Sequence, residues 1–131
     1  MLPFRVELRP GESPYRQVVY AATKAVVSGE LPAGAPFPSV RELSQALKIN
    51  PNTAHKVVAE LTRDGLLTVK PGVGTVVSSD RRATAAERRK LLSHEVEQLV
   101  VEAKRLGLER DDVVNAVSSR WSDLSGKRGD R

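Results

Sequence analysis

Amide, hydroxyl, imidazole and ammonium groups follow one another closely in one short segment of the chain. They belong to Asn52, Thr53, His55 and Lys56. Such groups exchange hydrogen bonds with phosphates and with the edges of nucleic-acid bases, and they do so effectively from the first turns of a helix. The segment therefore indicates a surface that reads DNA.

A helix must carry these polar groups outward. Asn50 is a suitable N-cap, and Pro51 fits the first helical position because the N–H that proline lacks would go unpaired there. Ala54, Val57 and Leu61 recur at helical spacing, which predicts one buried face and one exposed polar face.

A second helix is predicted directly before this one. Ser39 and Glu42 have the spacing of a capping box, in which the serine oxygen accepts a backbone N–H and the glutamate reaches back. Leu43, Ala46 and Leu47 share one face of that helix, and a short turn follows. Two helices joined in this way are the layout of a helix-turn-helix.

A glycine-tipped hairpin is predicted after the reading helix. Residues 66–69 and 75–78 are strand-like, and residues 70–74 form the turn between them. A hairpin in this place is the wing of a winged helix-turn-helix.

Scaffold elements are predicted at the start of the chain. Residues 4–8 alternate between apolar and charged side chains, which indicates either a short half-buried strand or an extended arm. Ser13 and Pro14 then mark the start of a helix that continues to about Ser28.

The C-terminal part is predicted to contain two amphipathic helices. One runs from about Thr84 to Leu106 and the other from about Asp111 to Leu124. Their apolar side chains either cover the chain's own winged domain or pair with a second copy. We favour a dimer, because the winged domain already closes its own core and two helices alone need another apolar surface. The expected dimer interface consists of Leu92, Val96, Leu99, Ala103, Leu106, Val117 and Trp121.

The expected fold class is mainly α with a small β-hairpin wing. The domains are a winged helix-turn-helix in residues 1–78, a linker in residues 79–83 and a two-helix dimerisation region in residues 84–124. Residues 125–131 are expected to be a disordered tail.

Composition narrows the classes of function. The chain has no cysteine, so it offers neither a disulfide nor a thiolate metal site. A nucleophilic triad would have to use His55 or His94, and neither has the setting of an activated base. We expect neither an enzyme nor a bound cofactor or metal. The net charge of +5 suits a polyanionic partner. Since the chain shows neither a long apolar run nor a signal peptide, a cytoplasmic protein is expected.

Five short motifs occur along the chain in a particular order and at a particular spacing. They are Leu31-Pro32-Ala33-Gly34, Pro38-Ser39-Val40-Arg41-Glu42-Leu43, Asn50-Pro51-Asn52-Thr53, Asp64-Gly65-Leu66-Leu67 and Gly72-Val73-Gly74-Thr75. With this order and spacing the chain resembles the bacterial GntR family of transcriptional regulators. Its short two-helix tail is similar to the YtrA-like branch, whose members often govern transporter operons.

The resemblance implies which residues contact DNA. They are Ser39 and Arg41 from the first helix of the motif, Asn52, Thr53, His55 and Lys56 from the reading helix, and Gly72, Gly74 and Thr75 from the wing. The resemblance also implies repression. The expected homodimer, being twofold symmetric, implies an inverted-repeat operator. For the effector three alternatives remain open, namely a small apolar compound at the dimer interface, a metal ion, or no direct effector.

Other interpretations of the same residues remain open. The chain could be a nucleoid-type DNA binder of low sequence specificity, or a winged helix used only for contacts with other proteins. Arg41 could form an internal salt bridge, for example with Glu42, instead of contacting DNA.

Overall fold

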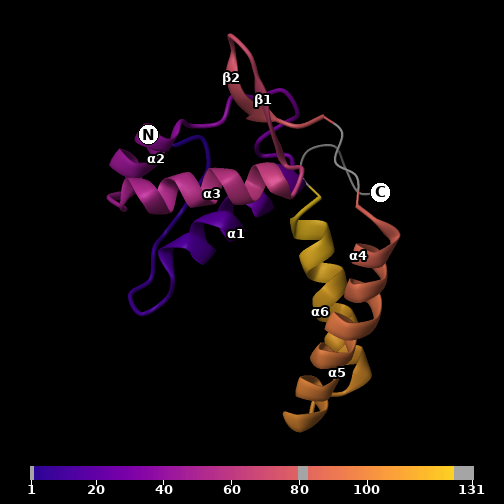
Figure 1. Cartoon of the computed structure of the whole chain (residues 1–131). Coiled ribbons are helices and arrows are strands. Elements are labelled where there is room, and N and C mark those ends of the chain that lie inside the picture. The colour runs from indigo at the N-terminus through magenta and orange to yellow at the C-terminus, as the bar shows by residue number, and fades with distance from the viewer. Residues whose placement is uncertain (1, 80–82, 126–131) are drawn as a thin grey trace. The chain divides into compact units, whose positions relative to one another are not determined.

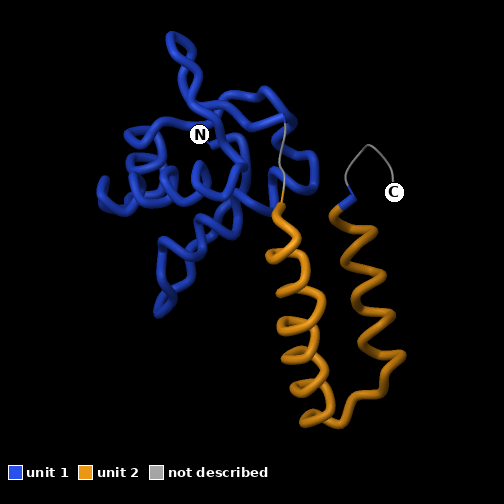
Figure 2. Tube along the Cα trace, turned by 45° about the vertical axis from the view of Figure 1, so that its right-hand side comes forward, with its two compact units in different colours: residues 1–81, 125–131 blue, residues 82–124 orange. Residues whose placement is uncertain are grey.

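The computed structural model describes residues 2–79 and 83–125. Its elements are α1 (Pro14–Val27), α2 (Val40–Leu47), α3 (Pro51–Arg63), β1 (Leu67–Lys70), β2 (Gly74–Val77), α4 (Ala85–Lys90), a π-helical turn (Leu91–Glu95), α5 (Val96–Arg105) and α6 (Arg110–Asp123). They form two units: the first holds α1 to α3 and both strands, and the second holds α4 to α6 (Figure 2). The predicted linker and tail lie largely outside the described residues.

Short polar side chains begin the helices of the first unit, as predicted. The Ser13 hydroxyl accepts the Arg16 N–H at 3.3 Å, and the Asn50 amide oxygen accepts the Asn52 N–H at 2.7 Å. Each of these bonds satisfies a donor that the helix itself leaves unpaired. α2 ends at Lys48, whose left-handed φ of +55° turns the chain into α3.

The core of the first unit lies where its three helices meet. Val18 of α1, Leu43 of α2, and Val57 and Leu61 of α3 are completely buried. Burying side chains of this size contributes about 1.5–3 kcal/mol each. This packing determines the orientation of α3, and the predicted buried face of that helix is confirmed.

The wing is an antiparallel pair of strands that follows α3. Leu67 pairs with Val77 and Lys70 pairs with Gly74, so the predicted strands are confirmed to within one residue. The loop before α2 joins the edge of the sheet, because the Phe37 N–H donates to the Thr75 carbonyl at 2.9 Å. The hairpin projects away from the helices (Figure 1).

The N-terminal segment is an extended arm and not a strand. Phe4 is buried and its ring stacks on that of Phe37, with 5.6 Å between the ring centroids. The backbone of Arg9 is held by the Gln17 side chain, which both accepts and donates a hydrogen bond there. A side chain of α1, rather than a neighbouring strand, therefore holds the backbone where the arm ends.

The second unit departs from the expected single long helix. Thr84 caps its start, but the five residues from Leu91 to Glu95 form a π-helical turn between α4 and α5. The Ser93 hydroxyl donates to the Arg89 carbonyl at 2.6 Å, and this bond competes with the regular helical bonding of that carbonyl. Throughout residues 2–79 and 83–125, no helix has both the length and the apolar character needed to cross a membrane.

Candidate nucleic-acid interface

The start of α2 is held by a complete capping box. The Ser39 N–H donates to the Glu42 carboxylate at 2.8 Å, and the Glu42 N–H donates to the Ser39 hydroxyl at 3.1 Å. The bond from the Ser39 backbone is the main cause that lowers the pKa of the Glu42 carboxyl group, and the Ser39 side chain adds to it. The Glu42 carboxylate is therefore charged at neutral pH and already engaged in the cap.

Arg41 lies beside this cap with its guanidinium group exposed. Within the described part of the chain it forms neither a hydrogen bond nor an ion pair through its side chain. The alternative of an internal salt bridge to Glu42 is not formed in this structure. Its guanidinium group is thus available to a phosphate or to a guanine edge, both of which it can bind in a bidentate manner.

The outward face of α3 carries most of the predicted reading residues. Asn52, His55 and Lys56 are exposed, whereas Thr53 is half-buried at the border of that face. The amide oxygen of Asn50 is occupied as the helix cap, so this residue has a structural role. The amide, imidazole and ammonium groups that remain can exchange hydrogen bonds with base edges and phosphates.

A hydrogen bond holds the C-terminal half of α3 against α1. The Tyr15 hydroxyl donates to the Glu60 carboxylate at 2.8 Å, and Arg63 forms an ion pair with the same carboxylate. The bond from Tyr15 is the main cause that lowers the pKa of Glu60, and the same bond raises the pKa of Tyr15. This contact joins the reading helix to the scaffold.

Replacing Tyr15 with phenylalanine is expected to lower the melting temperature by a few degrees at neutral pH. Because the pKa of Glu60 is lowered in the folded chain, its contribution to stability is present above the unfolded pKa and is lost as the pH falls through the lowered value. The pKa of Tyr15 is raised, so its contribution is present below the unfolded pKa and is lost as the pH rises through the raised value. The difference between variant and wild type should therefore shrink in acid and in strong base.

Thermal melts followed by circular dichroism across a pH series would measure this difference. Tyr20→Phe is the matched control, since Tyr20 lies on the same helix with 67% of its surface exposed. Equal losses in the two variants, or a loss that does not depend on pH, would contradict the role assigned to the Tyr15 bond.

The wing tip is shaped by two glycines. The Val73 N–H donates to the Lys70 carbonyl at 3.0 Å, and Gly72 has a φ of +76°. This is the conformation of a type II turn, with Pro71 at its second position and glycine at its third. Gly74 has a φ of +115°, another conformation that side chains disfavour, so both glycines are required by the backbone.

All nine residues predicted to contact DNA lie in the first unit, at three places: the start of α2, the first turns of α3, and the wing. Thr75 is half-buried, and the other wing residues of the set are exposed. Lys70 and Val73 at the wing tip are also exposed but were absent from the predicted set. Their position in a turn between two predicted strands is the signal in the sequence that points to them.

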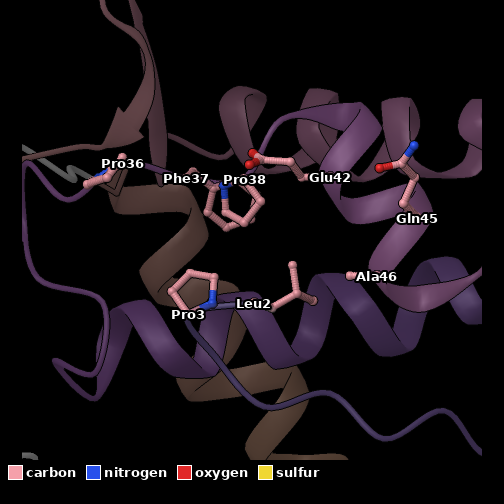
Figure 3. Close-up of a pocket in the computed structure, with 8 residues that line it drawn as sticks. All are labelled: Leu2, Pro3, Pro36, Phe37, Pro38, Glu42, Gln45 and Ala46. Atoms are coloured by element: carbon pink, nitrogen blue, oxygen red, sulfur yellow. The ribbon is translucent and has the colours of Figure 1, made fainter.

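A shallow hollow of about 480 Å³ lies beside α2 (Figure 3). Leu2, Pro3, Phe37, Pro38 and Ala46 are among the residues that line it. Ala46 was predicted to face the core with Leu43, but it is exposed at the border of this hollow. None of the predicted DNA contacts lines the hollow, so it is separate from the candidate interface. In the ranges that the structure describes, no group of side chains could hold a metal ion.

Comparisons with known proteins agree with this arrangement. The sequence pattern described as "Bacterial regulatory proteins, gntR family" matches residues 14–77. The HTH-type transcriptional repressor YtrA of Bacillus subtilis is 27% identical over 123 residues, which cover 93% of this chain and 95% of the relative.

Solved structures show the same fold. A transcriptional antiterminator from Listeria monocytogenes EGD-e has a TM-score of 0.80 at 22% identity, covering 98% of this chain and 95% of that chain. A GntR family transcriptional regulator from Listeria monocytogenes has a TM-score of 0.64 at 25% identity, covering 86% of this chain and 98% of that chain.

The family pattern covers α1 to β2, which are the elements that carry every predicted DNA contact. Similarity to YtrA continues beyond them through most of the chain. Residues 14–77 are thus a GntR-family winged helix-turn-helix, and the protein is a YtrA-like, DNA-binding transcriptional regulator.

Proposed function

We propose that this protein is a repressor that binds an inverted-repeat operator as a homodimer, through the nine residues predicted from the sequence. Similarity to the repressor YtrA supports the direction of regulation. Because the chain resembles the YtrA-like branch, we expect its target genes to belong to a transporter operon. We expect the protein to act in the cytoplasm, where the bacterial chromosome lies.

The observation that carries this proposal is the exposed apolar surface of the second unit. Leu92, Val96, Leu99, Leu106, Val117 and Trp121, six of the seven predicted interface residues, are exposed. Ala103, the seventh, is the only buried residue among those described in this unit, so its side chain has less surface to offer a partner. A helical hairpin that buries so little cannot be stable without a further apolar surface.

A second copy is the occupant that fits this surface best. The faces of α5 and α6 are both apolar, and two identical hairpins can bury them together as a four-helix arrangement. The π-helical turn widens the surface, because the Val96 N–H donates to the Leu91 carbonyl and residues five apart then lie one above the other. In a regular α-helix Leu91 would lie on a different side of the helix from Val96, but the π-helical turn brings both residues to the same face.

Dimerisation would explain how a small winged unit, with few DNA contacts of its own, can bind one operator selectively. A twofold axis would place two α3 helices about 34–36 Å apart, in successive major grooves on one side of the duplex. Bound across a promoter, such a dimer would exclude the polymerase. An effector would relieve repression by changing the geometry of the dimer or of the linker between the units.

Selection of bound sequences from a random duplex pool tests the proposal. The expected result is an enriched inverted repeat whose half-sites are centred about one helical turn apart or slightly more. A single unrepeated site would refute the dimeric operator. Binding without enrichment and with steep salt dependence would identify a nucleoid-type protein, and absence of duplex binding would identify a protein-interaction module.

A further inference from the structure

The most exposed large apolar side chain in the described part of the first unit lies at the tip of the wing. Val73 has 72% of its surface exposed, between Gly72 and Gly74. The turn that presents it is closed by the bond from its own N–H to the Lys70 carbonyl. Val73 is therefore displayed by a defined turn.

The tip has no side chain that could read a base by hydrogen bonding. Between the paired residues Lys70 and Gly74 stand Pro71, Gly72 and Val73, none of which carries a polar group on its side chain. The nearby Thr68 hydroxyl is paired with Ser78 at 2.5 Å. Lys70, at the base of the turn, offers a positive charge suited to a phosphate. Any base preference of the side chains between Lys70 and Gly74 must come from shape and apolar contact.

Apolar side chains discriminate between base pairs in the minor groove for a steric reason. The amino group of guanine projects into that groove and keeps an apolar side chain at a distance. If the side chain approaches nevertheless, the amino group loses its hydrogen bond to water and gains none in exchange. A·T pairs lack this group, and A-tracts narrow the groove so that its walls lie closer to an inserted side chain. Valine methyl groups therefore make more contact over A·T pairs than over G·C pairs.

We propose that Val73 is a specificity-determining residue, which selects A·T pairs in the minor groove next to the segment read by α3. The inference rests on the operator-binding function proposed above and adds to it a sequence preference outside the major-groove half-site. Isolated exposed apolar residues are common on protein surfaces. Val73 differs from them because it occupies the projecting tip, where the glycine on each side of it allows close backbone approach and an exposed lysine stands at the base of the turn.

Val69 provides a matched comparison on the same hairpin. It is also a valine, with 61% of its surface exposed, but it lies within β1 opposite Thr75 and not at the tip. Val69→Ser and Val73→Ser make the same chemical change without altering the charge. Only the second is expected to change base preference.

The test is selection from a random duplex pool with the full-length wild type and both variants. Wild type and Val69→Ser are expected to enrich A·T pairs at the same positions flanking each half-site, and Val73→Ser is expected to lose that enrichment. In direct titrations at fixed salt, a G·C substitution at those positions should weaken the wild type and Val69→Ser by about five-fold and Val73→Ser by less than about two-fold. The salt dependence should be the same for all three proteins, because the number of phosphate contacts is unchanged.

Persistence of the A·T enrichment in Val73→Ser would overturn the proposal, as would its loss in both variants alike. If the wild type enriches major-groove half-sites without an A·T flank, the role of Val73 is refuted while the operator function stands. If the wild type enriches no sequence at all, the proposed operator function itself fails.

Discussion

Replacing Leu99 with aspartate is expected to make the protein monomeric and to weaken its binding to a two-half-site operator by about 10²- to 10⁴-fold. Leu99 lies on α5 with 47% of its surface exposed, on the same face as Val96 and Val100. In a dimer the new carboxylate would be buried against apolar side chains without a partner, which is strongly unfavourable. Without a dimer, each winged unit must bind its half-site independently.

Sedimentation equilibrium would give the mass, and titration with duplexes carrying one or two half-sites would give the affinities. Affinity for the single half-site should stay unchanged, which separates loss of the dimer from damage to the winged unit. Val101→Asp is the matched control, because Val101 is also exposed but lies about 200° away from Leu99 around the helix. A dimeric Leu99→Asp variant, or a monomeric wild type, would rule out this interface.

Local chemistry explains why the winged unit could be predicted in detail. The side chains of Ser39 and Asn50 act on backbone groups only two or three residues away, so the sequence itself contains both partners of each helix cap. The same holds for the wing, where Gly72 and Gly74 meet the needs of a turn formed within a few residues. Structure of this kind depends little on the rest of the chain.

Contacts between distant segments were not predictable in the same way. The stacking of Phe4 on Phe37 depends on how the arm crosses the folded helices, so the alternation in the arm could not distinguish a strand from an extended chain. In the second unit, apolar periodicity predicted a continuous helix. The π-helical turn there coincides with a side-chain bond from the Ser93 hydroxyl to the Arg89 carbonyl, and the apolar periodicity reports neither feature.

The candidate interface contains one feature that the sequence predicts and one that it does not. The polar face of α3 followed from helical spacing, since the buried positions determine which residues point outward. Whether Arg41 pairs with Glu42 could not be decided from the sequence, because either arrangement suits neighbouring residues of opposite charge. In the structure the capping box engages the Glu42 carboxylate, and among the described residues Arg41 forms no ion pair with it.

Replacing Arg41 with alanine is expected to weaken operator binding by roughly 1–3 kcal/mol, about 5- to 150-fold, with no loss of fold. Arg41 is exposed and contributes no bond to the core or to the cap of α2, so its removal should leave the melting temperature unchanged. Gel-shift titrations over a range of salt concentrations would measure both the affinity and the number of phosphates contacted. Arg16→Ala is the matched control, since Arg16 is an exposed arginine on α1, on the side of α3 away from the wing (Figure 1).

Arg41→Lys separates the two contacts that this guanidinium group could make. A lysine retains the charge but not the planar pair of donors, so it should preserve a phosphate contact and lose a bidentate contact with guanine. A phosphate contact therefore predicts near-normal binding by Arg41→Lys, and a shallower salt dependence only for Arg41→Ala. A guanine contact predicts that both variants lose discrimination at one base pair of the half-site. Wild-type affinity and base preference in Arg41→Ala would remove this residue from the interface and leave recognition to α3 and the wing.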